Sequence, residues 1–266
     1  MSAGDLFAEG KLAEALVASI DEVKKNPAEA GLRWRFAELL CFAGDFERAD
    51  NQIQTLLTQF PKLATNAVLF RQLIRAEVAR QQLLTDGRLP ELLIQPTESI
   101  QKCLEIVVHT RGGDEVMAAE CSQAAEELRF KPQGSCNGVR FDDLRDLDDL
   151  TSSVLEVFAG DGKYLWVPFA KIQSIQFHKP ERPRDLLWRS ATLKAEALRA
   201  NVFIPALYSG TCRESDENLR LGRLTNWKGS DTGPAFGLGQ KMWLVGEQQL
   251  SLMEISEIQF DATESS

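Results

Sequence analysis

Two amphipathic segments joined by a glycine turn, between Gly31 and Pro61, constrain the fold of this chain most. In the first segment, apolar residues recur at the i, i+4 and i+8 positions that form one face of an α-helix: Leu32, Phe36 and Leu40. Gly44 and Asp45 interrupt this pattern, and a second amphipathic run follows until Pro61. The stretch therefore predicts a hairpin of two helices.

The hairpin has a copy 34 residues earlier in the chain. Four positions repeat at this spacing, since Gly10, Leu12, Ala15 and Pro27 correspond to Gly44, Phe46, Ala49 and Pro61. A fixed period of this length resembles the tetratricopeptide repeat; the alternative is two unrelated hairpins in register by chance. The next copy fails, because Val78 occupies the position of the turn glycine. Other helices must then complete the stack, because such arrays need about three units.

Helical patterns continue to Phe130 and then stop. We predict helices over 12–25, 31–60 as the hairpin, 66–85, 99–108 and 114–130, and a loop over 131–138. Later segments are short and predict strands over 153–158, 163–169, 172–178, 202–204, 242–245 and 250–260, with a helical turn over 185–189. The predicted fold is α+β: a tetratricopeptide-like helical domain over 1–131, followed by a mostly antiparallel, β-rich C-terminal domain over 139–266.

Composition narrows the class of protein. The net charge is −9 and neither half of the chain is basic, which argues against a nucleic-acid-binding surface. The sequence has no apolar run of the roughly 20 residues that span a bilayer and no visible secretory signal. The five cysteines form no CxxC pair, which favours reduced, mostly buried thiols. These features predict a cytoplasmic protein.

No sequence motif predicts a cofactor or a metal site. His109 and His178 are far apart, with no cysteine or second histidine at ligand spacing. The glycines of 233–239 do not form a phosphate-binding motif. The aspartates of 142–149 could bind a divalent cation, but the run lacks the glycine and glutamate of an EF-hand. We expect a solvated surface or capping segment there.

One helical face is a candidate partner-binding surface. In the repeat template, the first helix of each pair lines the concave side, which selects Trp34, Glu38, Cys41 and Phe42 and, one repeat later, Val68, Gln72 and Arg75. The predicted partner is an amphipathic helix or an extended peptide lying in a groove. The alternative is that the C-terminal domain covers these side chains.

A second hypothesis is an enzyme with its site in the C-terminal domain or in the cleft between the halves. It rests on the charged and aromatic residues Arg184, Asp185, Arg220, Arg223 and Trp227, which could form an anion site. The alternative is that arginine–aspartate pairs fix the loops of this domain.

Several ordered blocks of the chain resemble the ImpE/TagJ family. They are Leu6 to Ala15, Arg35 to Asp45, Val154 to Val157, Tyr164 to Phe169, Arg184 to Trp188, Phe203 to Tyr208 and Leu219 to Trp227. The chain departs from the family pattern at residues 149–153. The resemblance implies a non-catalytic cytoplasmic accessory protein of bacterial type VI secretion. It further implies binding to the N-terminal helix of the contractile sheath small subunit and a link to the ATPase that disassembles the sheath.

Overall fold

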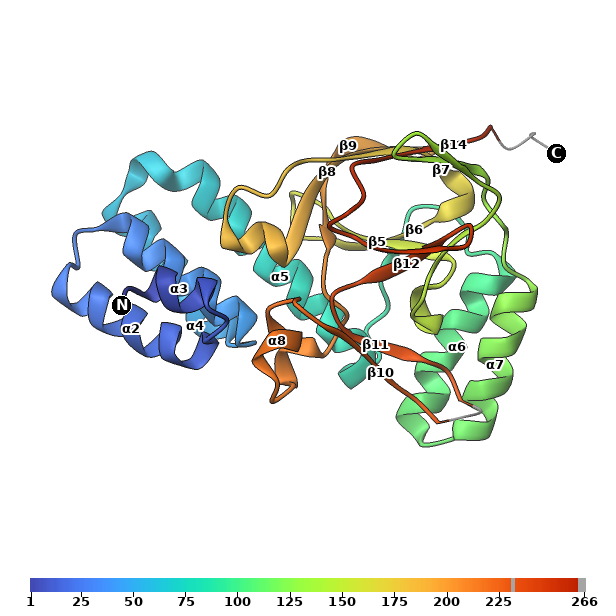
Figure 1. Cartoon of the computed structure of the whole chain (residues 1–266), viewed down its shortest axis with the longest axis horizontal. Coiled ribbons are helices and arrows are strands. Elements are labelled where there is room, and N and C mark those ends of the chain that lie inside the picture. Colours follow the sequence, from blue (N-terminus) through green and yellow to red (C-terminus); the bar gives the residue numbers. More distant parts are fainter. Residues whose placement is uncertain (231–232, 263–266) are drawn as a thin grey trace.

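The computed structural model describes residues 1–230 and 233–262, and its first third is helical (Figure 1). The α-helices are α1 (Ala3–Ala8), α2 (Leu12–Lys25), α3 (Ala30–Phe42), α4 (Phe46–Gln59), α5 (Ala64–Asp86), α6 (Glu98–Gly112), α7 (Glu115–Glu127) and α8 (Glu217–Arg220). The short 3-10 segments in the described part of the chain are η1 (Pro61–Leu63), η2 (Asp149–Thr151), η3 (Phe169–Lys171), η4 (Pro183–Leu186) and η5 (Thr211–Arg213). The predicted hairpin is α3 and α4.

Local chemistry fixes the ends of this hairpin. Gly44 has a φ of +76°, a left-handed conformation that costs glycine least. Asp45 then caps α4, because its carboxylate accepts a hydrogen bond from the backbone N–H of Arg48 at 3.3 Å. Pro61 starts η1, where its missing N–H costs nothing. The glycine and proline signals in the sequence thus have the predicted structural roles.

Most strands belong to one large sheet. The strands are β1 (Glu91–Leu92), β2 (Gly134–Cys136), β3 (Val139–Phe141), β4 (Leu144–Asp146), β5 (Val154–Phe158), β6 (Tyr164–Pro168), β7 (Ile172–Phe177), β8 (Trp188–Ala195), β9 (Leu198–Pro205), β10 (Thr225–Lys228), β11 (Phe236–Gly239), β12 (Met242–Val245), β13 (Gln248–Ser251) and β14 (Glu257–Phe260). The nine-stranded sheet has the order β1-β6-β5-β9-β8-β7-β14-β2-β3. A smaller sheet, β13-β12-β4, and the hairpin β10-β11 complete the arrangement. Among the described residues, the strand pairs are antiparallel except β1 with β6, so the α+β fold class is confirmed.

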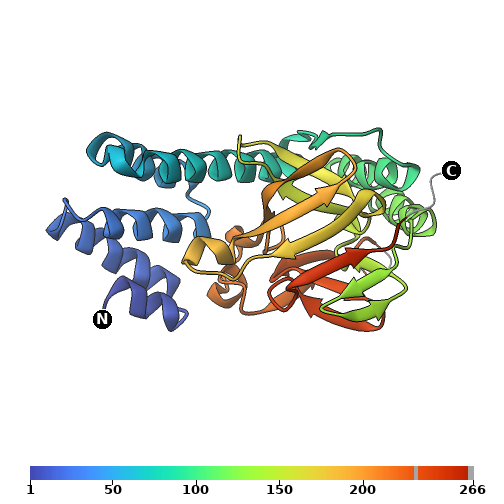
Figure 2. The ribbon, with the colours of Figure 1, turned by 90° about the horizontal axis from the view of Figure 1, so that it is seen from above.

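Strands β5 and β6 separate two apolar cores. Successive side chains of a strand point to opposite faces. Val154 and Phe158 of β5 therefore join the core shared with the helices, whereas Leu155 and Val157 face the core beneath β12. The long helix α5 crosses from the helical hairpins to the sheet and contacts β5 and β6 (Figure 2). The helix-side core is continuous across both parts of the chain, and the predicted division into domains over 1–131 and 139–266 stays a prediction.

The structure corrects four sequence predictions. The part before Phe130 is not entirely helical, because β1 pairs with β6 at the sheet edge. Within the predicted loop 131–138, β2 pairs with β14. The predicted helical turn 185–189 is instead the end of η4 and the start of β8, and the predicted strand 250–260 is two strands joined by a turn. Strands this short show no readable period, and they form because a neighbouring strand offers paired backbone groups.

No helix among the described residues is long and apolar enough to cross a membrane.

Candidate functional site

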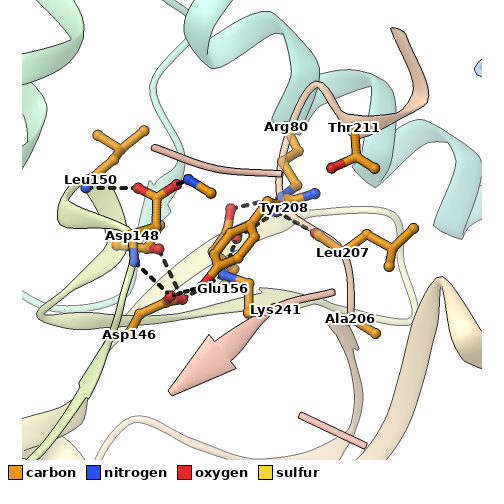
Figure 3. A network of polar contacts seen from close by, with 12 residues as sticks. Arg80, Asp146, Asp148, Leu150, Glu156, Ala206, Leu207, Tyr208, Thr211 and Lys241 are labelled. Atoms are coloured by element: carbon orange, nitrogen blue, oxygen red, sulfur yellow. Dashed lines mark hydrogen bonds and ion pairs between the residues drawn. The ribbon is translucent and has the colours of Figure 1, made fainter. Parts of the chain in front are cut away.

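A buried ion pair joins α5 to the sheet (Figure 3). Arg80 Nε lies 2.8 Å from Glu156 Oε1 and Arg80 Nη2 lies 2.7 Å from Glu156 Oε2, an arrangement that matches the planar fork of the guanidinium. Arg80 also donates to the carbonyl oxygen of Leu207 at 3.0 Å. Tyr164 donates its hydroxyl to Glu156 at 2.6 Å. The contact therefore satisfies both charges inside the protein.

Lys241 extends this contact into a network. Its Nζ lies 2.9 Å from Glu156 Oε2 and 2.7 Å from Asp146 Oδ2. The hydroxyl of Thr151 donates to Asp146 Oδ2 at 3.0 Å, and that of Tyr208 lies 3.0 Å from Asp146 Oδ1. We call Arg80, Glu156, Lys241 and Asp146 the buried ion network; their side chains are at most 4% exposed.

The network fixes the charge states of its members. Burial alone would raise the pKa of Glu156, but Arg80 and Lys241 hold it well below its usual range. Burial would lower the pKa of Lys241, but Asp146 and Glu156 raise it. Burial, with the nearby charge of Asp146, raises the pKa of Asp148 to about 7, although the N–H groups of Gly237 and Leu150 act in the opposite direction. Glu156, Lys241 and Arg80 therefore remain charged at neutral pH.

The sequence predicted a solvated surface or a capping segment for the acidic run 142–149. Asp148 does cap η2, because its carboxylate accepts the backbone N–H of Leu150 at 2.9 Å, but most of the run is not a solvated surface. Asp146 and Asp148 are buried, Asp143 pairs with Arg129 at 2.6 Å, and Asp149 pairs with Arg145 at 2.6 Å. Sequence reasoning missed the network because its partners lie 76 to 95 residues apart, and only the fold brings them together. The density of aspartates in this run was the one available signal.

The space beside the network is too small for a substrate. Two cavities flank Arg80, each of about 30 Å³. One lies towards Cys41 and Cys212 and the other towards Asp148 and Ser209. Such a volume holds roughly one water molecule. Among the described residues there is also no group of three or more His, Cys, Asp or Glu side chains arranged to hold a metal ion.

The residues behind the enzyme hypothesis mostly serve the fold. Asp185 accepts the backbone N–H of Glu181 at 2.9 Å and of Arg182 at 3.2 Å. Arg223 donates to the carbonyl oxygens of Phe7 and Ala8, which ties the C-terminal part to α1. Trp227 packs against Tyr208 with ring centres 5.6 Å apart and ring planes tilted by 58°, and Arg220 Nε lies 3.5 Å from the carbonyl oxygen of Phe42. They do not converge on one pocket.

Three of the predicted partner-binding residues are covered by their own chain. Glu38, Cys41 and Phe42 are each at most 3% exposed. The segment η4 packs on α3, which carries these residues. Burial raises the pKa of Glu38 to about 7, although Arg184 and the Trp34 indole lower it. This face of α3 is therefore an internal interface in the structure, which was the alternative left open by the sequence.

The other predicted residues lie on two different surfaces. Val68 is 47% exposed and Arg75 is exposed, while Gln72 lies against the β5–β6 turn at Gly162. On α5, Val68 is two positions from Asn66, about 200° around the helix. Asn66, however, lines a hollow together with Trp34. The structure does not bring Trp34 and Val68 together, and the role of the seven residues in partner binding stays a prediction.

Trp34 lies half-buried at an open hollow of about 350 Å³. Its lining residues are Ala30, Gly31, Trp34, Leu63, Asn66 and Arg182. The Trp34 ring packs on Phe70 with ring centres 5.5 Å apart, and its Nε1 donates to Glu38 at 3.1 Å. Arg184 lies on the Trp34 ring, with its Cζ atom 5.8 Å from the ring centre. We call this surface, defined by the six lining residues, the Trp34 hollow.

Comparisons with known proteins agree with the family resemblance predicted from the sequence. Residues 138–259 match the model of the family described as ImpE protein. The chain is 29% identical over 267 aligned residues, covering 100% of this chain and 93% of the relative, to the type VI secretion system accessory component TagJ of Pseudomonas aeruginosa. The crystal structure of a Vibrio parahaemolyticus protein is 29% identical and superimposes with a TM-score of 0.91 over 98% of both chains. The resemblance is thereby confirmed.

Proposed function

We propose that this chain, which carries an ImpE domain at residues 138–259, is a non-catalytic accessory protein of bacterial type VI secretion that acts in the cytoplasm. The observation that carries this proposal is the full-length similarity to the Pseudomonas aeruginosa accessory component. The crystal structure from Vibrio parahaemolyticus supports one shared fold over the same length.

The proposed partner is the N-terminal helix of the contractile sheath small subunit. The Trp34 hollow supports this choice because it is open, lies between the starts of α3 and α5, and is lined by an indole ring. An amphipathic helix inserts apolar anchors into such hollows, and tryptophan is a frequent hot spot of binding. Through this contact, the protein assists the coupling of the sheath to the ATPase that disassembles it.

The geometry gives less support to an enzyme. The buried ion network brings four ionisable side chains together, but the cavities beside it hold about one water molecule each. The charges of the network form ion pairs with one another. These pairs join α5 to the sheet and leave no charge available for a substrate. A catalytic site needs room for a substrate beside groups with perturbed pKa values.

A titration with a fluorescent peptide of the sheath subunit's N-terminal helix tests the proposal. We expect the Trp34→Ala variant to bind at least tenfold more weakly, because truncating a hot-spot residue costs about 2 kcal/mol or more. Trp227→Ala is the matched control, since Trp227 is 41% exposed and lies on β10. Equal affinities of the Trp34→Ala variant and the unaltered protein would remove the hollow from the proposed interface.

A further inference from the structure

Part of one face of the large sheet is open to solvent. Figure 2 shows the yellow and orange strands β7, β8 and β9 with no helix drawn across them. The apolar residues of β8 point into the core beneath β12, so Thr192 and Lys194 point away from it. Their cross-strand neighbours on β9, Asn201 and Arg199, share this face and are exposed. We call Thr192, Lys194, Arg199 and Asn201 the bare sheet face.

Two like charges lie opposite each other on the bare sheet face. Lys194 and Arg199 are directly paired across β8 and β9. The Cβ atoms of such a pair are about 5 Å apart, and like charges in this position are destabilising. Among the described residues neither cation forms an ion pair; Arg199 donates to the neutral amide oxygen of Gln173 at 3.5 Å, and the nearby Glu196 pairs with Lys171. The stability of the fold therefore does not explain this pair of cations.

The sequence of these strands is also unusual for the chain. In a protein of net charge −9, strands β7, β8 and β9 contain no Asp or Glu. The bare sheet face is therefore a locally cationic surface on an acidic protein, and an acidic partner meets no carboxylate of these strands there.

A chain of hydrogen bonds adds a third donor to the two cations. The Thr192 hydroxyl donates to Asn201 Oδ1 at 2.8 Å, which leaves the Asn201 amide nitrogen as a donor on the exposed side. His178 Nε2 lies 3.1 Å from the same hydroxyl oxygen and holds it in place. The Lys194 ammonium, the Arg199 guanidinium and the Asn201 amide together form a set of donors that suits carboxylate oxygens.

The position of the bare sheet face favours a helix as the ligand. An added strand would pair with an edge of the sheet, but β8 is paired on one side with β7 and on the other with β9. A helix satisfies its backbone internally and packs on the face of a sheet. Phe203 of β9, on the same side, joins the core shared with α5, so a further helix would extend an existing layer. Nucleic acid is less suited, because phosphate contacts need many more cations than two.

We propose that the bare sheet face binds an acidic helix of a partner protein through two carboxylates that lie one helical turn apart. Side chains at positions i and i+4 of a helix start about 5–6 Å apart, which matches the separation of Lys194 and Arg199. One carboxylate meets the Lys194 ammonium, and the other meets the Arg199 guanidinium and the Asn201 amide. The contact is open to solvent, so it is weak and decreases with salt.

This surface is separate from the one in the proposed function. It shares no residue with the Trp34 hollow, so the two proposals stand or fall independently.

The test follows the backbone amide NMR signals of the isotope-labelled protein during a peptide titration. The probe is an alanine- and glutamine-based helical peptide of roughly 20 residues, long enough to form a helix in water, with two Glu four positions apart. The matched peptide carries Gln at both positions. The protein variants are Lys194→Gln and Arg199→Gln. Lys25→Gln is the control, since Lys25 is exposed at the end of α2 and its loss changes the net charge equally.

We expect the Glu peptide to shift the signals of residues 190–201 and the Gln peptide to leave them unchanged. Lys194→Gln and Arg199→Gln should each bind the Glu peptide about two- to fivefold more weakly, the value of an exposed charge pair. Lys25→Gln should bind as the unaltered protein does. The thermal midpoint of Lys194→Gln should be unchanged or raised, since the variant removes a repulsion between like charges.

Four outcomes overturn the inference. If the Glu peptide leaves β8 and β9 unshifted, or the Gln peptide shifts them equally, the face does not bind helix carboxylates. Equal shifts from sodium acetate at the same carboxylate concentration would make it a site for free anions only. Tighter binding of a single-stranded oligonucleotide at the same residues would assign the face to nucleic acid. A marked fall in the thermal midpoint of Lys194→Gln would make the cation pair a structural feature.

Discussion

Arg80 of α5 and Glu156 of β5 form a two-pronged ion pair, at 2.8 and 2.7 Å, between the helical part of the chain and its sheet. Lys241 shares the same carboxylate at 2.9 Å. One carboxylate therefore holds two buried cations, one from a helix and one from the segment that leads into β12. This group therefore joins α5 to the sheet beside the apolar core that the two share.

The Glu156→Ala variant should have a much lower free energy of unfolding than the unaltered protein. Arg80 and Lys241 would both lose a buried acceptor, and breaking a buried pair by removing one partner costs about 3–5 kcal/mol. Chemical denaturation gives the free energy of unfolding. Arg140→Ala is the control, because Arg140 and Asp261 form an exposed pair that solvent screens and that contributes little to stability. Similar losses in the two variants would contradict a special role for the network.

The contribution of Glu38 to the free energy of unfolding should fall as the pH rises. Burial raises its pKa from an ordinary 4.5 to about 7, so the folded state binds a proton more tightly than the unfolded state does. Its stabilising contribution is fully present below pH 4.5 and is lost as the pH rises through about 7. Relative to the unaltered protein, Glu38→Gln should gain up to about 3 kcal/mol between pH 5 and pH 8, at 1.36 kcal/mol per pKa unit.

The measurement is the free energy of unfolding of both proteins at pH 5 and pH 8. The exposed Glu247→Gln variant serves as the control, and its pH dependence should match that of the unaltered protein. If Glu38→Gln also keeps the original pH dependence, the carboxylate of Glu38 is ionised throughout this range and the burial argument is wrong.

Gly134 should tolerate no side chain. A Cβ atom at this position would overlap the backbone carbonyl oxygen of Gln259 on the paired strand β14, and a paired backbone cannot move aside cheaply. We expect Gly134→Ala to destabilise the protein by about 1–3 kcal/mol, the usual cost of overpacking. Gly112→Ala is the comparison, because no atom lies within 4 Å of a Cβ there and the residue ends α6. In thermal unfolding, Gly134→Ala should have a clearly lower midpoint than Gly112→Ala.

The sequence predicted well where the signal is local. The bounds of α2 are those predicted, because its apolar face repeats every 3.6 residues and Pro27 lies just beyond its end. The turn at Gly44 was also predicted from a local signal, because Gly44 and Asp45 interrupt the apolar pattern of the first helix. Strands β5 and β6 followed from the short apolar runs that predicted strands over 153–158 and 163–169.

The candidate site depended on contacts that no local pattern contains. The repeat template selected positions of α3 for partner binding, but Glu38, Cys41 and Phe42 are buried within the chain. The segment that packs on that helix, η4, lies more than 130 residues later in the sequence. Sequence spacing describes which side of a helix a residue occupies and not what covers that side.

The sequence by itself therefore determined the helical hairpins, their glycine and proline boundaries and the change to short strands after Phe130, since each arises from interactions within a few residues. Only the tertiary structure decided which charges are paired. Asp146, Glu156 and Lys241 are ordinary polar residues in the sequence, and burial in one contact makes their pairing obligatory, because an unpaired charge in the interior is far too costly. The same principle distinguishes Arg184, the buried arginine whose Nε and Nη1 find no partner in the described part of the chain.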